Sequence, residues 1–379
     1  MRKVTSLKKK IDKKKGGDPH FLGSGTYGCA YKPPIKCEGE CTDVKCQKDA
    51  KVISKYMNNK YAEDERLMFD RLDLNTINHR NQYHIGKPYK CKPKSDFIPN
   101  PYECDVKIKN PAILLYEDGG KDLDDYLKRP CLPYDFINKI ENLLEFILKM
   151  INFRIAHCDI KNGNIVSGVD GNHFRFIDFG LAINFKETFK YDSIFSKVYY
   201  FWLPSAIFLS NIPEKISDEQ IEKYCKEFYE KTERHRFLNT FIKKNRINTY
   251  TLKEILIGIR EKIKSGLPIL TILRLIDLYS FTTLLDYYLY YHINKFFPEY
   301  SMKLAILFMK FLDDTQIYNP NPFKACSPDI FYEKFKKFKY DVKELGITVA
   351  NIKKFNSKSF KQLKRKSQYK SYKKIGNSV

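Results

Sequence analysis

Four polar residues in the middle of the 379-residue sequence carry side chains suited to proton and metal chemistry. The segment HCDIKNGN begins at His157, and an Asp-Phe-Gly triplet begins at Asp178, fourteen residues after Asn164. Asp159 can accept a proton from a hydroxyl group, and Lys161 can steady a transferring phosphoryl group. Asn164 and Asp178 supply amide and carboxylate oxygens of the kind that Mg²⁺ prefers. Each residue alone would be an ordinary surface or turn residue, but the joint spacing is very hard to obtain by chance.

A glycine-rich segment, GSGTYG over residues 23–28, has the GxGxxG spacing of a loop that approaches phosphate groups. The same spacing marks dinucleotide-binding folds, where the loop opens a helix, and it also occurs in turns that bind nothing. Here strand-favouring residues continue through Ala30 and Tyr31, and Pro33-Pro34 then forbid a helix. A strand, loop and strand that cover phosphates with backbone amides fit better.

A lysine and a glutamate further along the chain have the spacing of an ion pair. Lys55 ends the run VISK, the VxxK spacing of a strand that ends in a phosphate-binding lysine, and Lys51 is its rival. In the helix expected over residues 61–74, Glu65 has apolar residues at i+3, i+4 and i+7, a stripe that would face inward. Glu63 has an arginine at i+3 instead. We therefore expect Lys55 to pair with Glu65.

The elements that must position these residues are strands early in the chain and helices late. A buried strand is expected over residues 112–116 and a helix over 134–155, followed by short strands at 165–166 and 174–177. Residues 75–110 are rich in Asn, Pro, Lys and Tyr without clear periodicity, which indicates a loop insertion.

The second half of the chain is expected to be helical. Ser217 with Gln220, and Thr251 with Glu254, have capping-box spacing before amphipathic runs. The apolar stretch over residues 267–293 contains an arginine and two aspartates, which are costly at bilayer depth. This stretch therefore favours a buried helix over a transmembrane segment.

Together the motifs resemble those of a eukaryotic-type protein kinase. GSGTYGCAYKPPIKC, VISKYM and the following AEDE are similar to serine/threonine kinases encoded by large nucleocytoplasmic DNA viruses, and the resemblance covers about residues 20–310. It implies an α+β, bilobal protein-kinase fold, with a small β-rich N-lobe containing one main helix and a larger α-helical C-lobe with insertions. The implied divisions are a basic disordered arm (1–18), the N-lobe with Cys-containing and Pro/Asn-rich insertions (19–118), the C-lobe with an insertion around 206–266 (119–316), and an extension with a basic tail (317–379).

The resemblance also implies an activity, transfer of the γ-phosphoryl group of ATP to Ser or Thr hydroxyls of protein substrates, with Mg²⁺ or alternatively Mn²⁺. Asp159 is the implied catalytic base, with Lys161 and Asn164 as further catalytic residues. Asn164 and Asp178 are the implied metal ligands. The lysine two positions after Asp159 is the serine/threonine-type pattern. The implied ATP-binding residues are Leu22, Gly23, Ser24, Gly25, Thr26, Tyr27, Gly28, Ala30, Lys55, Glu65, Leu115 and Glu117.

Two further positions are matched by the resemblance. Leu115–Glu117 would form the hinge near adenine, with Leu114 as the gatekeeper. Asp277, in the segment IDLYS, would bond to the backbone of the loop that carries Asp159. Such a bond would explain an acidic residue in the most apolar stretch of the chain, where an unpaired carboxylate is expensive.

The sequence departs from the kinase pattern at two places. Cys158 stands where most kinases have an arginine that pairs with an activation-loop phosphate. We therefore expect activity without phosphorylation of the segment's hydroxyl residues, namely Thr188, Tyr191, Ser193, Ser196 and Tyr199. The usual Ala-Pro-Glu appears as Leu203-Pro204-Ser205, so the anchoring of this segment and the peptide specificity stay open.

The net charge of +23 is concentrated at the two ends of the chain. Residues 1–18 carry eight basic and two acidic side chains, and residues 353–379 carry ten basic and none acidic. Both tails could attract nucleic acid or another acidic partner, whereas codon bias is the alternative explanation of the charge. The catalytic region is expected to act as a monomer.

The ten cysteines lie in a chain without a secretory signal, because the basic N-terminus lacks an apolar run. We expect reduced thiols in a protein that is not secreted and acts in the host cytoplasm or the virion of a large DNA virus. Cys37, Cys41 and Cys46, completed by Cys91 or Cys104, are an alternative zinc site, although CxxC pairs are absent.

Two other functions compete with protein phosphorylation. A pseudokinase scaffold would use the fold to bind partners, but Lys55, Asp159, Asn164 and Asp178 are all present, which favours an enzyme. A small-molecule kinase on a related fold is disfavoured because a segment of protein-kinase length follows the Asp-Phe-Gly triplet.

Overall fold

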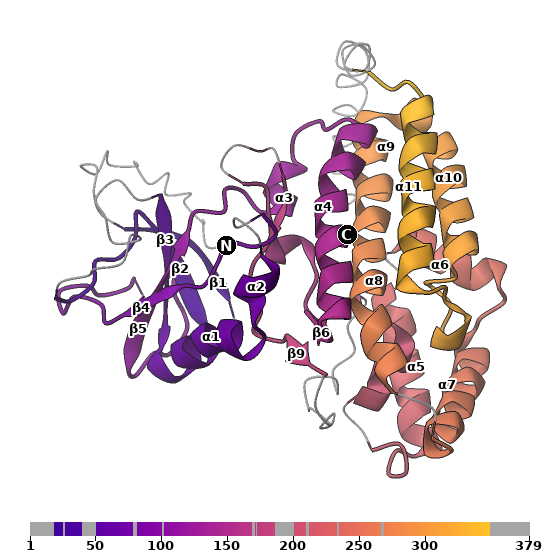
Figure 1. Cartoon of the computed structure of the whole chain (residues 1–379), viewed down its shortest axis with the longest axis horizontal. Coiled ribbons are helices and arrows are strands. Elements are labelled where there is room, and N and C mark those ends of the chain that lie inside the picture. The colour runs from indigo at the N-terminus through magenta and orange to yellow at the C-terminus, as the bar shows by residue number, and fades with distance from the viewer. Residues whose placement is uncertain are drawn as a thin grey trace, which may run out of the picture. The chain divides into compact units, whose positions relative to one another are not determined.

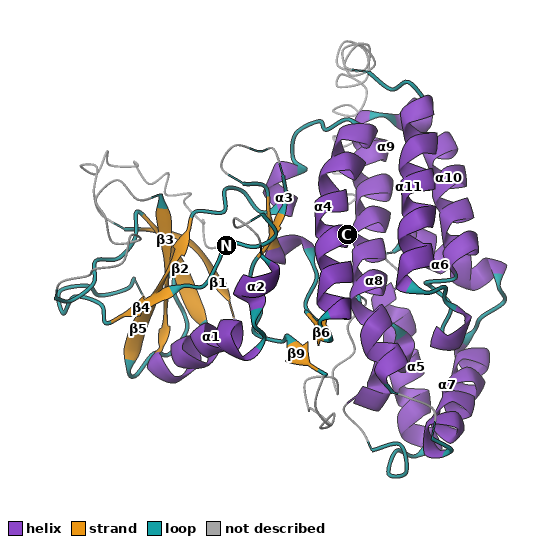
Figure 2. Ribbon diagram, in the orientation of Figure 1, coloured by secondary structure: helices purple, strands orange, loops and turns teal. Residues whose placement is uncertain are grey.

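The computed structural model describes residues 19–25, 27–39, 51–78, 82–100, 102–168, 171, 173–185, 201–209, 212–232, 235–266 and 269–348. It consists of two compact units. The first contains the residues up to Phe69 together with Gly86–Asp118, and the second contains Asp70–Ile85 together with the chain from Gly119 onward. A five-stranded antiparallel sheet and many helices make this an α+β fold, which confirms the predicted class (Figure 2). Both basic tails lie outside the described residues.

The first unit is built on the five-stranded sheet (Figure 1). Its spatial order is β1-β2-β3-β5-β4, and every neighbouring pair is antiparallel. The strands are β1 (His20–Gly25), β2 (Gly28–Lys32), β3 (Val52–Asn58), β4 (Tyr89–Cys91) and β5 (Pro111–Glu117). Helix α1 (Asn59–Arg71) follows β3 directly. The expected loop insertion over residues 75–110 is therefore wrong in part, because it contains β4, a three-residue strand too short to show a periodicity.

One face of this sheet is closed by the segment between β4 and β5. Buried side chains from β2, β3 and β5 form a cluster with Cys104, and Phe97, Val106 and Ile108 pack against it. Tyr31 and Tyr56 both meet the ring of Phe97 edge-on, at centroid distances of 5.4 and 5.5 Å. The insertion thus supplies the second half of a small core.

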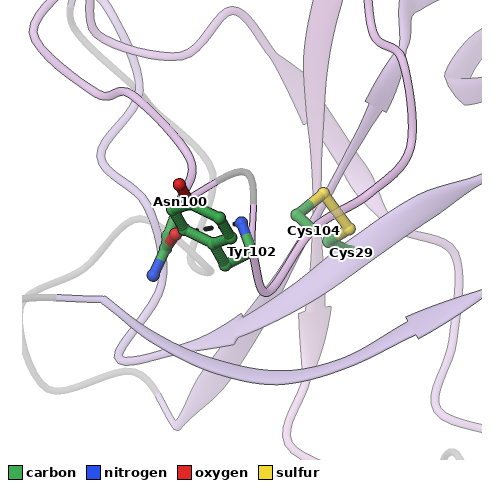
Figure 3. Close-up of a disulfide and its surroundings, with 4 residues drawn as sticks. All are labelled: Cys29, Asn100, Tyr102 and Cys104. Atoms are coloured by element: carbon green, nitrogen blue, oxygen red, sulfur yellow. Dashed lines mark hydrogen bonds between the residues drawn. A yellow bond between two sulfur atoms is a disulfide. The ribbon is translucent and has the colours of Figure 1, made fainter. Parts of the chain in front are cut away.

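One disulfide fastens this segment to the sheet, and a second joins the stretch after β2 to β4. Cys29 in β2 bonds to Cys104, as Figure 3 shows, and Cys37 bonds to Cys91 in β4. The expectation of reduced thiols is therefore wrong for these four cysteines, whose partners lie 75 and 54 residues apart in sequence. The same bonds engage the thiols that the zinc alternative needed, and no metal-binding group of His, Cys, Asp and Glu occurs among the described residues. Cys41 and Cys46 lie outside them.

The second unit begins with short elements that surround a long helix. Strands β6 and β9 pair with each other, as do β7 and β8, both antiparallel. The bounds are α2 (Leu74–Ile77), α3 (Leu123–Tyr126), α4 (Pro133–Asn152), β6 (Ile155–Ala156), β7 (Ile165–Val166), β8 (Arg175–Phe176) and β9 (Ile183–Asn184). The predicted helix and strand pair are present, but the helix ends before Ile155, which lies in β6.

The remainder of this unit is helical, as expected (Figure 2). The α-helices are α5 (Asp218–Thr232), α6 (Arg236–Lys244), α7 (Thr249–Lys264), α8 (Leu270–Tyr287), α9 (Ile293–Phe296), α10 (Ser301–Thr315) and α11 (Pro328–Glu344). A π-helical turn, Tyr288–His292, joins α8 to α9. Segments of 3₁₀ helix cover Asn162–Asn164, Pro204–Leu209, Pro298–Tyr300 and Pro322–Lys324.

One predicted capping box is present and the other is wrong. Ser217 and Gln220 satisfy each other's backbone amides at 2.8 and 3.2 Å, ahead of α5. Helix α7 instead begins at Thr249, and its N-cap is Asn248, whose side chain accepts the amide of Thr251 at 2.8 Å. Asn248 is as good a cap as a threonine, so the earlier residue starts the helix.

Helices α4, α8, α10 and α11 pack together in the second unit (Figure 1). Helix α8 is buried on nearly all sides, and phenylalanines of α11 pack on Phe281 of α8 and Phe311 of α10. Lys339 of α11 also pairs with Glu141 of α4. The residues expected to form a C-terminal extension after residue 316 therefore contribute a helix to this core.

Among the described helices, none combines the length and the apolar character that crossing a bilayer requires.

Candidate functional site

The glycine-rich segment forms the β1–β2 hairpin, as the sequence predicted. Gly25 of β1 pairs with Gly28 of β2. A Cβ atom on Gly28 would lie 2.5 Å from the carbonyl oxygen of Tyr56 in β3, so a larger residue would push the strands apart. Leu22 and Tyr27 are exposed, and Thr26 lies outside the described residues. The described residues of the hairpin thus have the strand, loop and strand arrangement that the sequence predicted.

The sheet face opposite the disulfide-linked segment carries Lys55. Ala30, Lys55 and Leu114 are cross-strand neighbours on β2, β3 and β5. Because side chains alternate along a strand, these three share one face and Leu115 lies on the other, where it belongs to the disulfide-linked cluster. Glu117, two residues further, shares the face of Leu115.

The predicted ion pair between Lys55 and Glu65 is present. Nζ of Lys55 lies 2.9 Å from Oε1 and 2.7 Å from Oε2 of Glu65, a residue of α1 that is only 9 % exposed. The hydroxyl of Tyr116 donates a hydrogen bond to the same carboxylate. The rival Lys51 is exposed and lies immediately before β3.

Glu63 has different partners, as its spacing indicated. It accepts hydrogen bonds from Arg66 at 2.5 Å and from Lys90 at 2.7 Å. These two cations lower the pKa of Glu63 to about 2. The three residues line a pocket of about 830 Å³ near β4, which includes none of the predicted ATP-binding residues.

Residues predicted to be catalytic converge in the second unit. Nζ of Lys161 lies 2.9 Å from both carboxylate oxygens of Asp159. Nδ2 of Asn164 donates to Oδ2 of Asp159 at 2.7 Å and to its backbone oxygen at 2.9 Å. Burial raises the pKa of Asp159, and the hydrogen bond from Lys161 opposes that rise. Asp159 is therefore an oriented carboxylate with a strengthened affinity for a proton.

Asp178 lies close enough to act on Asp159 electrostatically. Its negative charge adds to the rise in the pKa of Asp159. The backbone amide of Ile177 donates to the carbonyl of Asn164 at 3.0 Å. This bond joins the backbone of one predicted metal ligand, Asn164, to the residue before the other, Asp178. Oδ1 of Asp178 accepts the amide of Gly180 at 3.2 Å. Asn164 and Asp178 could hold Mg²⁺ or Mn²⁺, because amide and carboxylate oxygens are ligands that these ions prefer. The contacts of Asn164 with Asp159 use its amide nitrogen.

Asp277 of α8 binds the backbone of the loop that bears Asp159. The carboxylate of Asp277 accepts the backbone amides of His157 at 2.6 Å and Cys158 at 2.9 Å, as the resemblance implied. Burial raises the pKa of Asp277 to about 6, and these two amides counteract the rise. Cys158 has a φ of 61°, a left-handed conformation that needs such support in a non-glycine residue.

His157 supports the site as a neutral ring. It is fully buried, and burial lowers its pKa to about 4. Its ring packs on Phe179 and Phe176 at centroid distances of 4.6 and 5.2 Å. His157 is therefore a packing residue beneath the Asp-Phe-Gly triplet.

The sequence did not predict two of the contacts, that of Tyr116 with Glu65 and that of Trp202, whose indole donates to the carbonyl of Cys158 at 2.7 Å. A signal existed for the second, since Trp202 is the one tryptophan of the chain. Among the expected residues, Lys55 and Glu65 belong to the first unit, whereas Asp159, Lys161, Asn164 and Asp178 belong to the second.

Comparison with models of known protein families gives no match to this chain, and comparison with curated proteins gives no significant match.

Proposed function

We propose that the protein is a serine/threonine protein kinase with a bilobal fold, in which the two units are the lobes. The observation that carries the proposal is the triad in which Lys161 and Asn164 both bind the carboxylate of Asp159. The Lys55–Glu65 pair and the glycine hairpin in the first unit support it independently. Phosphoryl transfer needs little covalent chemistry from a protein, so positioning and charge stabilisation by such groups are the expected contributions.

In this proposal the substrate hydroxyl oxygen attacks the γ-phosphorus of ATP while the bond to the β,γ-bridging oxygen breaks. Asp159 takes the hydroxyl proton, and its raised pKa improves it as a base. Lys161 offers its ammonium group to the oxygens of the transferring group, and ADP leaves with the bridging oxygen. Asn164 and Asp178 would hold Mg²⁺, which supplies positive charge to the ATP phosphates. Lys55, oriented by Glu65, would bind the α- and β-phosphates.

A transfer assay with the purified full chain tests the proposal. Wild-type protein with Mg-ATP should phosphorylate a general protein acceptor on Ser or Thr, as read by phosphoamino-acid analysis. Asp159→Asn and Asp178→Ala should each reduce turnover by about 100-fold or more. Asp313→Asn, which alters an exposed pair with Lys244, is the matched control and should retain activity.

The competing functions give different results in the same assay. A pseudokinase scaffold would bind partners with no transfer in any variant. A small-molecule kinase would consume ATP only with a small acceptor and leave proteins unlabelled. Equal turnover by wild type and both aspartate variants would contradict the catalytic assignment.

A further inference from the structure

The sole tryptophan of the chain lies against the loop that carries Asp159. Nε1 of Trp202 donates a hydrogen bond of 2.7 Å to the backbone oxygen of Cys158. Trp202 and Cys158 are both fully buried. A buried carbonyl in such a place needs a donor, so this bond is a specific contact between two segments 44 residues apart.

The carbonyl that Trp202 holds belongs to the peptide unit immediately before Asp159. The nitrogen of that unit, the amide of Asp159, donates to Nδ1 of His157 at 3.3 Å. The preceding amide, that of Cys158, is held by Asp277. Trp202 therefore holds the carbonyl of this peptide unit, while Asp277 and His157 hold the neighbouring amides, and together these contacts set the direction in which Asp159 leaves the turn.

The segment that carries Trp202 is itself anchored to the same helix. The hydroxyl of Ser280 in α8 donates to the backbone oxygen of Phe201. Helix α8 thus holds the Asp159 loop through Asp277 and the neighbour of Trp202 through Ser280. The hydrogen bond from Trp202 to Cys158 then links these two segments directly. A displacement of the segment would be transmitted to the peptide before Asp159 through the hydrogen bond from Trp202 to Cys158.

We infer that Trp202 is a positioning residue that holds Asp159 in its working orientation, so that the site needs no covalent modification of the segment before residue 201. The inference rests on the proposed function and names its regulation. The contact is a neutral hydrogen bond between an indole and a backbone carbonyl, and neither group changes on phosphorylation. Cys158, the residue held, carries no positive charge with which to bind a phosphate.

Replacing Trp202 by phenylalanine removes the donor and keeps an aromatic ring. The matched control is Tyr288→Phe, because the Tyr288 hydroxyl is also a fully buried aromatic donor to a backbone carbonyl, that of Cys131 at 3.0 Å. Both variants should lower the melting temperature. Only Trp202→Phe should lower kcat, by about tenfold, with the KM for ATP changed less than twofold. Phosphatase-treated wild type should keep its kcat. Equal kcat in the two variants, or loss of kcat on phosphatase treatment, would overturn the inference.

A readout that does not use activity separates this inference from the proposed function. Hydrogen exchange in the peptide containing residues 157–164 should become faster in Trp202→Phe than in wild type or Tyr288→Phe. If wild type transfers no phosphate but this difference appears, the proposed function fails and the positioning role stands. If exchange is unchanged, the positioning role fails whatever the activity. Should the variant not fold, Trp202 emission in wild type decides: a solvent-exposed, readily quenched indole contradicts the contact.

Discussion

Both carboxylate oxygens of Glu65 accept hydrogen bonds from Nζ of Lys55, at distances of 2.9 and 2.7 Å. The two residues lie in the same unit, on α1 and on the adjoining strand β3. Charge-assisted hydrogen bonds of this kind are stronger than neutral ones and orient both partners. The lysine is therefore oriented by a residue of its own unit.

Glu65→Gln should lower kcat/KM for ATP by about tenfold, since a neutral amide holds the ammonium group less firmly and such bonds contribute about 1.5–3 kcal/mol. Steady-state kinetics with ATP as the varied substrate measure the effect. Glu63→Gln is the matched control on the same helix, because its partners are Arg66 and Lys90. If both variants lost the same activity, the effect would belong to α1 as a whole and not to the Lys55–Glu65 pair.

Asp277→Asn should lower the free energy of unfolding by about 1–3 kcal/mol, because an amide has one acceptor oxygen for the two buried amides of His157 and Cys158. Denaturant titration measures this loss. Asp286→Asn is a close control, since Asp286 is also fully buried and accepts the amides of Phe237 and Leu238. Both variants should lose stability, but only Asp277→Asn should also lose turnover. Unchanged turnover there would show that the amide contacts do not matter to the site.

Cys104→Ser should destabilise the first unit by about 2–4 kcal/mol by releasing the segment that closes the sheet face. Thermal unfolding of the unreduced protein measures the effect, and mass spectrometry of the unreduced chain should find Cys29 linked to Cys104. Cys225→Ser, which changes a buried cysteine outside any disulfide, should leave that linkage intact. A chain in which all cysteines react with a thiol reagent before reduction would contradict both bridges.

Acidification should destabilise the protein in part through His292. Its Nε2 accepts the amide of Cys131 at 3.0 Å, and burial lowers its pKa to about 4. The folded state prefers the neutral ring of His292. The stability that this ring contributes is therefore fully present above the pKa of the unfolded state, about 6.5, and is lost as the pH falls through about 4. The shift corresponds to about 3 kcal/mol.

His292→Gln should therefore flatten the fall in melting temperature between pH 7 and pH 4.5. Asp277 and Asp286 have raised pKa values, so they favour folding at low pH. Wild type and His292→Gln both contain these aspartates, so their effect cancels when the two pH profiles are compared. His20→Gln, at an exposed position of β1, should keep the wild-type pH dependence. Identical pH profiles of wild type and His292→Gln would rule out this role of the histidine.

Local patterns predicted local structure well. The spacing around Glu65 correctly indicated which glutamate meets Lys55, because a helical period decides which side chains face a sheet. The capping box at Ser217 was also found from spacing alone. The one at Thr251 failed because Asn248, three residues earlier, caps the helix first.

The sequence could not reveal contacts between distant segments. The partners of Cys29 and Cys37 lie in a stretch without periodicity, so nothing local marks them as neighbours. The face on which Leu115 points depends on the register of β3 with β5, which places it with the disulfide cluster and opposite Lys55. The contact between Trp202 and Cys158 likewise exists only once α8 has brought both segments together.

The two disulfides are nested, since the Cys37–Cys91 loop lies wholly within the Cys29–Cys104 loop. Both loops enclose the stretch of chain that contains Lys55 and Glu65. A single backbone cut anywhere between the two inner cysteines would leave two chains that remain covalently joined at two points. In the oxidised protein, the lysine and glutamate of the proposed nucleotide site would thus stay tethered to the glycine hairpin even after proteolytic nicking, and only a reductant would let the pieces separate.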